Sequence, residues 1–156
     1  MAKRIDRASR LIHASAPKIY EAFSTAAAME NWLPPEGMTG TMLAFDFREG
    51  GMYRMLLSYN GVGHVAGKTT ERADEVTVRF VKLIPGRRIE QSITFNTANT
   101  AFAGEMHITW IFDEAVQGTE VIVFCEDVPE GIRPEDHEAG LASTLRNLAA
   151  FTEGVR

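Results

Sequence analysis

The segment Pro134–Glu153 predicts one long amphipathic helix, and it constrains the fold more than any other part of the chain. At 3.6 residues per turn, one stripe of this helix carries mostly apolar side chains, those of His137, Leu141, Leu145, Leu148 and Thr152. The opposite side carries Ala139, Ser143, Arg146, Ala150 and Glu153. An apolar stripe has to be buried against another element. Because the chain between Met29 and this helix reads mainly as strands, we expect the helix to pack on a curved antiparallel sheet.

The ends of the segment carry the signals that begin and end helices. Pro134 stands at the first helical position, where its fixed φ angle suits a helix. Glu135 and Asp136 follow in the first turn, where the helix dipole favours negative charge. Gly154 comes directly after the segment, as glycine commonly does at the C-terminus of a helix.

Length and charge limit the class of protein. With 156 residues, the chain is long enough for one domain with a substantial core, so we predict a single domain over residues 1–156. The net charge of −5 argues against binding to nucleic acid or to an anionic membrane surface. No apolar run reaches bilayer length, and no apolar segment follows the charged N-terminus as in a secretory signal. We therefore expect a cytoplasmic protein without membrane insertion; the one cysteine, Cys125, excludes an internal disulfide.

Before the long helix, the sequence predicts one strand, two short helices and six more strands. Ile5–His13 forms the first strand, and Ser15 caps a helix that begins near Pro17. A second helix contains Trp32 and ends before Pro34, because the residue preceding a proline is pushed out of the helical region. The six later strands are predicted over Thr39–Phe47, Gly51–Tyr59, Val76–Ile84, Arg88–Phe95, Phe102–Phe112 and Thr119–Asp127. The glycine-rich stretch 60–74 is the longest predicted loop, and such loops often have a functional role.

Alternation along two of these strands orients their side chains. The positions predicted to face the helix are Ile89, Gln91, Ile93, Phe95, Met106, Ile108, Trp110 and Phe112. The positions predicted to face outward are Arg88, Glu90, Ser92, Thr94, Glu105, His107 and Thr109. The predicted fold class is therefore α+β: a curved antiparallel seven-stranded sheet wrapped around a long C-terminal helix, with two short helices between strands 1 and 2.

Several motifs carry a resemblance to a known superfamily. They are Asn31-Trp-Leu-Pro-Pro35, Arg48-Glu-Gly-Gly-Met-Tyr-Arg54, Phe102-Ala-Gly-Glu-Met106, Gly118-Thr-Glu-Val121 and the run from Gly131 to Leu141. Together with the order of elements, they resemble the SRPBCC superfamily, whose helix-grip fold is shared by START domains, the birch-pollen allergen and polyketide cyclases. Within it, the chain is most similar to the branch named after the C-terminal domain of an activator of the ninety-kDa heat-shock protein's ATPase.

The resemblance covers essentially the whole chain and implies the fold more than the function, because its motifs are turn, cap and packing residues. The branch commonly has Gly-Trp near the start of the last helix, where this chain has Gly140-Leu141. The smaller leucine widens any space that lies beneath it.

Histidines and nucleophiles give little support for catalysis or metal binding. None of His13, His64, His107 and His137 has a second ligand at a zinc-type spacing, so we predict no metal and no cofactor. His107 is expected on the solvated face of its strand, and His64, in the long loop, is either a gate or simply exposed. His137 lies on the inward stripe, either at the mouth of a cavity or as a partly buried histidine bonded to a neighbour. No nucleophile motif is present, and no histidine is tied by local sequence to Cys125.

Methionines favour a ligand cavity between helix and sheet. Six of them fall in segments predicted to wall this space, Met29, Met38, Met42, Met52, Met55 and Met106. Flexible thioethers tolerate varied ligand shapes, although methionine also fills irregular gaps in a packed core. The polar side chains predicted to face inward are Tyr53, Tyr59, Gln91, Trp110 and His137. The full predicted ligand site comprises Trp32, Met42, Tyr53, Met55, Gln91, Ile93, Met106, Ile108, Trp110, His137, Leu141 and Leu145.

We therefore expect a domain that binds a small apolar or amphipathic molecule between the long helix and the concave face of the sheet. One alternative is an enzyme of cyclase, dehydratase or hydrolase type that works in the same cavity, but no inward carboxylate stands beside a base. A second alternative is a protein-interaction module, as the co-chaperone resemblance implies. A homodimer is also plausible, since an antiparallel sheet leaves two edges to pair.

Overall fold

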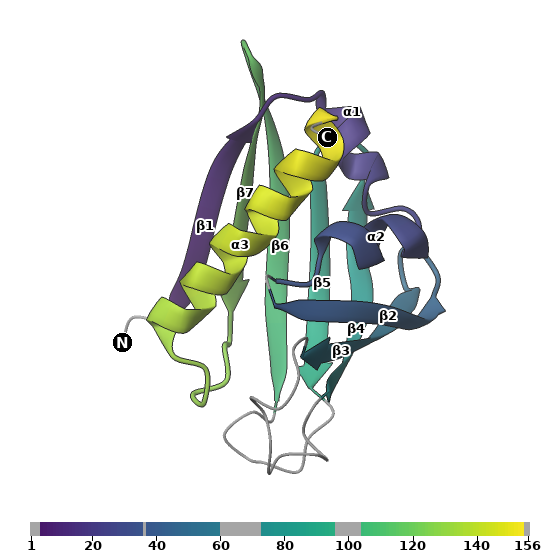
Figure 1. Cartoon of the computed structure of the whole chain (residues 1–156), viewed down its shortest axis with the longest axis vertical. Coiled ribbons are helices and arrows are strands. Elements are labelled where there is room, and N and C mark those ends of the chain that lie inside the picture. Colours follow the sequence, from purple (N-terminus) through teal and green to yellow (C-terminus); the bar gives the residue numbers. More distant parts are fainter. Residues whose placement is uncertain (1–3, 36, 60–72, 96–103, 155–156) are drawn as a thin grey trace.

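A computed structural model describes residues 4–35, 37–59, 73–95 and 104–154 of the chain. Figure 1 shows a strongly curved sheet with the long C-terminal helix lying across it. In chain order the elements are β1 (Ile5–Ile12), α1 (Ala16–Glu21), α2 (Ala26–Trp32), β2 (Met38–Phe45), β3 (Met52–Tyr59), β4 (Ala73–Ile84), β5 (Arg88–Phe95), β6 (Glu105–Ala115), β7 (Gly118–Glu126) and α3 (Pro134–Glu153).

The seven strands form one antiparallel sheet in the order β1-β7-β6-β5-β4-β3-β2. Helix α3 packs mainly against β1 and α2, and the short helices α1 and α2 connect β1 to β2 (Figure 1). The predicted α+β helix-grip fold, with two short helices between the first and second strands, is confirmed. None of the helices in the described part of the chain is long and apolar enough to cross a membrane.

Strand boundaries differ from the prediction where the sheet extends beyond the core. Strand β4 begins at Ala73, three residues before the predicted start at Val76. Strand β6 continues to Ala115 because it forms a tight hairpin with β7, in which Ala115 pairs with Gly118. The apolar alternation stops at Phe112, where the strand leaves the helix, but the backbone ladder does not need apolar side chains to continue. Residues 102–103, where this strand was predicted to start, lie outside the described residues, as do His64 and most of the long loop.

The helix signals in the sequence are confirmed in the structure. The Ser15 hydroxyl accepts a hydrogen bond from the backbone N–H of Lys18 at 3.3 Å, which caps α1. Helix α3 has Pro134 at its start and ends at Gly154, whose φ angle of 74° lies in the left-handed region. Local sequence was therefore sufficient to place the ends of α3.

A first prediction concerns two glycines of α3. Gly154→Ala should lower the free energy of unfolding by about 1 kcal/mol, because a Cβ atom disfavours the left-handed conformation of this cap. Gly140→Ala is the matched control, since this glycine is inside the same helix and an added Cβ meets no atom within 4 Å. It should raise the free energy of unfolding by about 0.5–1 kcal/mol. Urea unfolding of both variants measures the difference, and equal effects at the two sites would contradict it.

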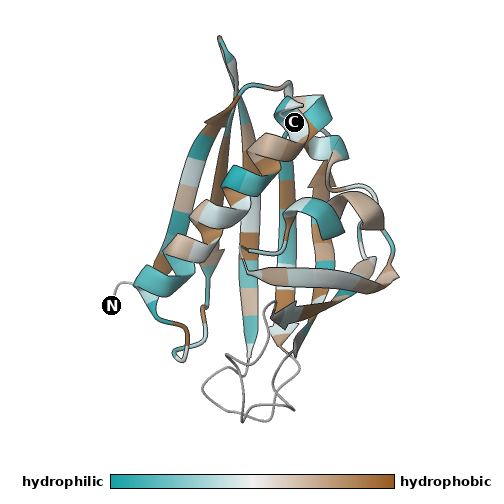
Figure 2. Ribbon diagram, viewed as in Figure 1, coloured by the Kyte–Doolittle hydropathy of each residue, from teal (hydrophilic) through white to brown (hydrophobic). Residues whose placement is uncertain are grey.

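The buried face of α3 is wider than the predicted stripe. Leu141, Leu145, Leu148 and Thr152 are buried as expected, but Ser143 is buried too, although it was predicted on the opposite side. The reason is that α3 packs against β1 and α2 in addition to facing the sheet. Figure 2 shows hydrophobic bands on the strands behind α3 and hydrophilic residues at the N-terminal end of the helix.

On β5 and β6 the predicted inward positions are buried or partly buried against the core. Two positions predicted to face outward, Ser92 and Thr109, are also buried. Ser92 pairs with Arg79 on one side and His107 on the other, so long side chains lie beside it on the outer face. Outward orientation therefore did not mean exposure to solvent.

Helix carboxylates cover parts of both sheet edges. Beyond the end of β1, the backbone N–H of His13 donates to the Glu153 carboxylate of α3 at 2.9 Å. At the bulge of β2, the N–H of Met42 donates to the Glu30 carboxylate of α2 at 2.5 Å. These two edge groups are not available to a second sheet. A homodimer, predicted from the free edges of the sheet, stays a prediction.

Candidate functional site

The structure brings most of the predicted site residues together between α3 and the sheet. Strand register places Ile93 opposite Met106 and Gln91 opposite Ile108, so these four side chains share the inner face. Buried positions of the predicted site on this face and on the helices are Trp32, Tyr53, Met55, Gln91, Ile93, Met106, Ile108, Trp110, Leu141 and Leu145. Met42 pairs with Met55 and is partly buried against the same core. The side chain of Tyr59 lies outside the described residues.

One of the six methionines does not face the core. Met52 alternates with the buried Tyr53 along β3, so its side chain lies on the outer face of the sheet. The prediction that Met52 walls the space beneath α3 is therefore wrong, because a shift of one residue in a strand reverses the face.

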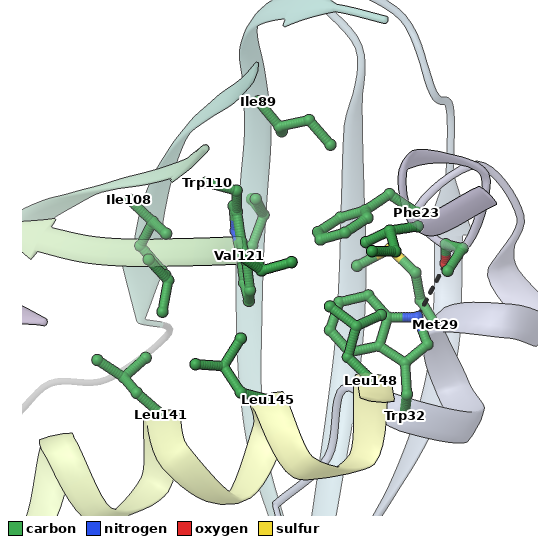
Figure 3. Packing of buried hydrophobic residues seen from close by; sticks show 14 of the residues in the cluster. Phe23, Met29, Trp32, Ile89, Ile108, Trp110, Val121, Leu141, Leu145 and Leu148 are labelled. Atoms are coloured by element: carbon green, nitrogen blue, oxygen red, sulfur yellow. Dashed lines mark hydrogen bonds between the residues drawn. The ribbon is translucent and has the colours of Figure 1, made fainter. Parts of the chain in front are cut away.

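Aromatic rings fill one end of the space under α3, where α1 and α2 lie (Figure 3). The ring of Phe23 packs edge-on against Trp32 and Trp110, with centroids 4.7 and 5.0 Å apart. The indole N–H of Trp32 donates to the carbonyl of Ala22 at 2.8 Å, which fixes its orientation. Leu148 of α3 lies beside Trp32 in the same view. We call this region the closed end; Trp32, predicted as a cavity wall, belongs to its packed cluster.

The other end of the same space is less completely sealed. Four apolar residues from β4, β5, β6 and α3 keep 8–9% of their surface exposed, namely Val76, Ile93, Ile108 and Leu141. Towards the closed end, Ile89 of β5 and Leu148 of α3 are fully buried. Figure 3 shows Ile108 and Leu141 pointing toward one another across the space between sheet and helix. We call this region the open end.

Gln91 lies between these two ends as a polar group in an apolar surrounding. Its side chain is 3% exposed, and its carbonyl oxygen accepts a hydrogen bond from the Trp110 indole N–H at 3.1 Å. Among the residues that the structure describes, its amide nitrogen has no hydrogen-bond partner. Buried polar groups in proteins are rarely left in this state.

His137 takes part in a charged cluster that the sequence did not predict. Its Nδ1 lies 2.7 Å from Asp6 Oδ2, and Arg4 binds both carboxylate oxygens of Asp6 at 2.9 and 2.8 Å. The Arg4 guanidinium holds the pKa of Asp6 below its ordinary value; burial acts in the opposite direction, and the bond to His137 lowers this pKa further. Of the two alternatives for His137, the structure shows the partly buried histidine bonded to a neighbour.

Asp6 is the important residue that sequence reasoning missed. It alternates in phase with the buried Ile12 along β1, which placed a carboxylate on the inner face. This alternation was the only local sign that Asp6 is buried, because its partner His137 is 131 residues away in the chain.

Burial keeps two further titratable side chains of the core in their neutral forms. Burial, with a smaller contribution from the Asp6 charge, raises the pKa of the Cys125 thiol to about 12, so the thiolate is strongly disfavoured at neutral pH. Burial also raises the pKa of the Tyr53 phenol. His107 is exposed on the outer face, as predicted, with its Nδ1 3.0 Å from Asp127. Within the described ranges, no three His, Cys, Asp or Glu side chains are grouped as a metal site requires.

A shallow cleft of about 460 Å³ lies elsewhere, between the segment 13–16 and the β6–β7 hairpin at 114–119. None of the predicted site residues lines it. The candidate site between α3 and the sheet is therefore defined by the side chains that meet there and not by this cleft.

Comparison with known proteins identifies the family. The sequence profile of the family described as Activator of Hsp90 ATPase homolog 1-like protein matches residues 13–153. The chain belongs to this family. The match includes α1 through α3 and begins directly after β1. The predicted membership of the SRPBCC superfamily, in its AHSA-type branch, is confirmed.

Several solved structures share the fold. Protein CV1439 from Chromobacterium violaceum is 30% identical, with a TM-score of 0.84 over 96% of both chains. The AHSA1-like protein from Aeromonas hydrophila is 15% identical, with a TM-score of 0.72 over 97% of this chain and 93% of the other. A protein from Rhodobacter sphaeroides is 18% identical, with a TM-score of 0.74 over 97% and 94%. No curated protein sequence matches the chain.

Proposed function

We propose that the protein binds a small apolar or amphipathic molecule between the first half of α3 and the inner face of β4, β5 and β6. The observation that carries this proposal is the difference between the two ends of the core. Leu141, Ile93 and Ile108 keep 8–9% of their surface exposed, whereas Ile89 and Leu148 keep none. Apolar side chains that line a partly accessible space are typical of sites for apolar ligands.

The chemistry of the lining favours binding over turnover. The polar side chains that β3, β5 and β6 place in this space are the neutral ones of Tyr53, Gln91 and Trp110, and burial disfavours ionisation of the Tyr53 phenol. Asp6 and His137 form the nearest acid–base pair, but the carboxylate is held by Arg4 through two hydrogen bonds. We place this activity in the cytoplasm, because the reducing conditions there keep a free thiol such as that of Cys125 reduced.

Native mass spectrometry tests the proposal. The purified protein is incubated with a total lipid and secondary-metabolite extract, desalted, and then analysed intact. A bound small molecule recovered unchanged supports the proposal, and a chemically altered one supports the cyclase, dehydratase or hydrolase alternative. If no small molecule is retained and a protein such as an Hsp90-type chaperone co-purifies instead, the interaction-module alternative replaces it.

A second prediction uses Leu141, where relatives in the branch carry tryptophan. Leu141→Trp should fill the open end, weaken ligand binding at least tenfold, and raise the free energy of unfolding by about 1 kcal/mol through added apolar burial. The control is Leu148→Trp at the closed end, which should overpack the core and lower the free energy of unfolding by about 1–3 kcal/mol. Thermal melts and ligand titrations of both variants measure these changes. A loss of stability in both would mean that the open end is close-packed as well.

A further inference from the structure

The orientation of the Gln91 side chain is decided by its neighbour. An indole N–H is a donor only, so the group that Trp110 contacts at 3.1 Å must be the carbonyl oxygen of Gln91. The amide nitrogen then points away from Trp110. Exchanging the two ends of the amide would place two donors against each other.

This amide nitrogen is a donor without an acceptor. The side chain is only 3% exposed, and no described residue accepts a hydrogen bond from its nitrogen. On the neighbouring strands its cross-strand partners are Phe80 and Ile108, which have no side-chain acceptor. A buried amide donor with no acceptor destabilises the free protein, and a bound acceptor removes that penalty.

We propose that Gln91 recognises a neutral carbonyl oxygen, that of a ketone or an ester, on an otherwise apolar ligand. This inference rests on the function proposed above, since it concerns the same space beneath α3. Trp110 positions the amide by holding its oxygen, and the two N–H bonds of the nitrogen are directed to the ligand. Gln91 thereby selects oxygenated apolar molecules over hydrocarbons of the same length.

The surrounding residues favour a neutral acceptor over a carboxylate. The described inward side chains of β3, β4, β5 and β6 include no lysine or arginine that would neutralise an anion. Arg4 is already paired with Asp6 on β1. An unpaired carboxylate would lose its hydration without gaining a counter-charge, whereas a ketone loses much less hydration free energy on burial. The site therefore fits a neutral oxygenated molecule rather than a free fatty acid.

Three probes of equal carbon number test the inference: nonane, 2-nonanone and nonanoate. Each is titrated into ¹⁵N-labelled protein, with the side-chain amide of Gln91 as a direct readout. We expect 2-nonanone to bind about tenfold more tightly than nonane, a factor that corresponds to about 1.4 kcal/mol. We also expect the Gln91 amide protons to shift downfield with the ketone alone, and nonanoate to bind more weakly than the ketone.

The matched variant is Gln91→Met, which keeps the length of the side chain and removes the donor. It should lose the preference for 2-nonanone over nonane. Because it also leaves the Trp110 indole without an acceptor, the double variant Gln91→Met, Trp110→Phe serves as a second test if the single variant is unstable.

The outcomes separate this inference from the function on which it rests. Equal binding of nonane and 2-nonanone to the wild type, an unmoved Gln91 amide, or a ketone preference retained in both variants overturns the role of Gln91 while binding itself stands. If none of the three probes binds, the proposed ligand site fails and the role of Gln91 fails with it.

Discussion

Replacing Asp6 with alanine should lower the free energy of unfolding by about 3 kcal/mol at neutral pH, because it removes the acceptor shared by Arg4 and His137. The Asp6 side chain is 2% exposed, and those of Arg4 and His137 are 29% and 14% exposed. Since Arg4 can recover part of its hydration, the loss falls at the lower end of the range for buried ion pairs. Urea unfolding at pH 7 measures the change.

A surface ion pair in the turn after β2 provides the control. Asp46 lies 2.7 Å from Arg48, but these side chains are 47% and 74% exposed. Asp46→Ala should therefore change the free energy of unfolding by less than about 0.5 kcal/mol. If Asp6→Ala proves as mild as this control, then the cluster does not hold α3 to β1.

The pH dependence of the same variant follows from the direction of the pKa shift. The pKa of Asp6 is lowered below its ordinary value of 3.8 in the folded protein, so folding favours the ionised form. The resulting stabilisation is fully present above the unfolded pKa and is lost as the pH falls through the folded pKa. The difference in stability between the wild type and Asp6→Ala should therefore shrink as the pH falls below about 4. A difference that grew on acidification would contradict the assigned shift.

Leu148→Ala should lower the free energy of unfolding by about 3–4 kcal/mol. Leu148 is fully buried and lies beside Trp32 at the closed end (Figure 3), where rigid rings cannot move in to fill the cavity. The control is Phe151→Ala on the same helix, whose side chain is 39% exposed and whose loss should cost less than about 1 kcal/mol. Chemical denaturation of both variants gives the comparison.

A small effect of Leu148→Ala would change the interpretation of the core. If its cost came close to that of Phe151→Ala, the closed end would be as loosely packed as the open end. The contrast between Leu141 and Leu148, which supports the proposed ligand site, would then lose its basis.

Local sequence was enough to predict most of the fold. Helix α3 spans the predicted residues because proline, glycine and the acidic first turn act within a few residues of each other. The inner faces of β5 and β6 followed from alternation, which is also local. Errors arose where distant elements decided the outcome. Ser143 is buried because β1 and α2 flank the helix, and Ser92 because its cross-strand neighbours cover it.

The candidate site shows the same difference between features set by local sequence and features set by distant contacts. The sequence by itself determined which side chains of β5 and β6 face the space beneath α3, since strand alternation depends only on spacing along the chain. Only the tertiary structure decided that Phe23, Trp32 and Trp110 fill one end, that Asp6 holds His137, and that the amide nitrogen of Gln91 is left without a partner among the described residues. These features depend on contacts between segments far apart in the chain, and spacing along a sequence carries no information on which distant side chains meet.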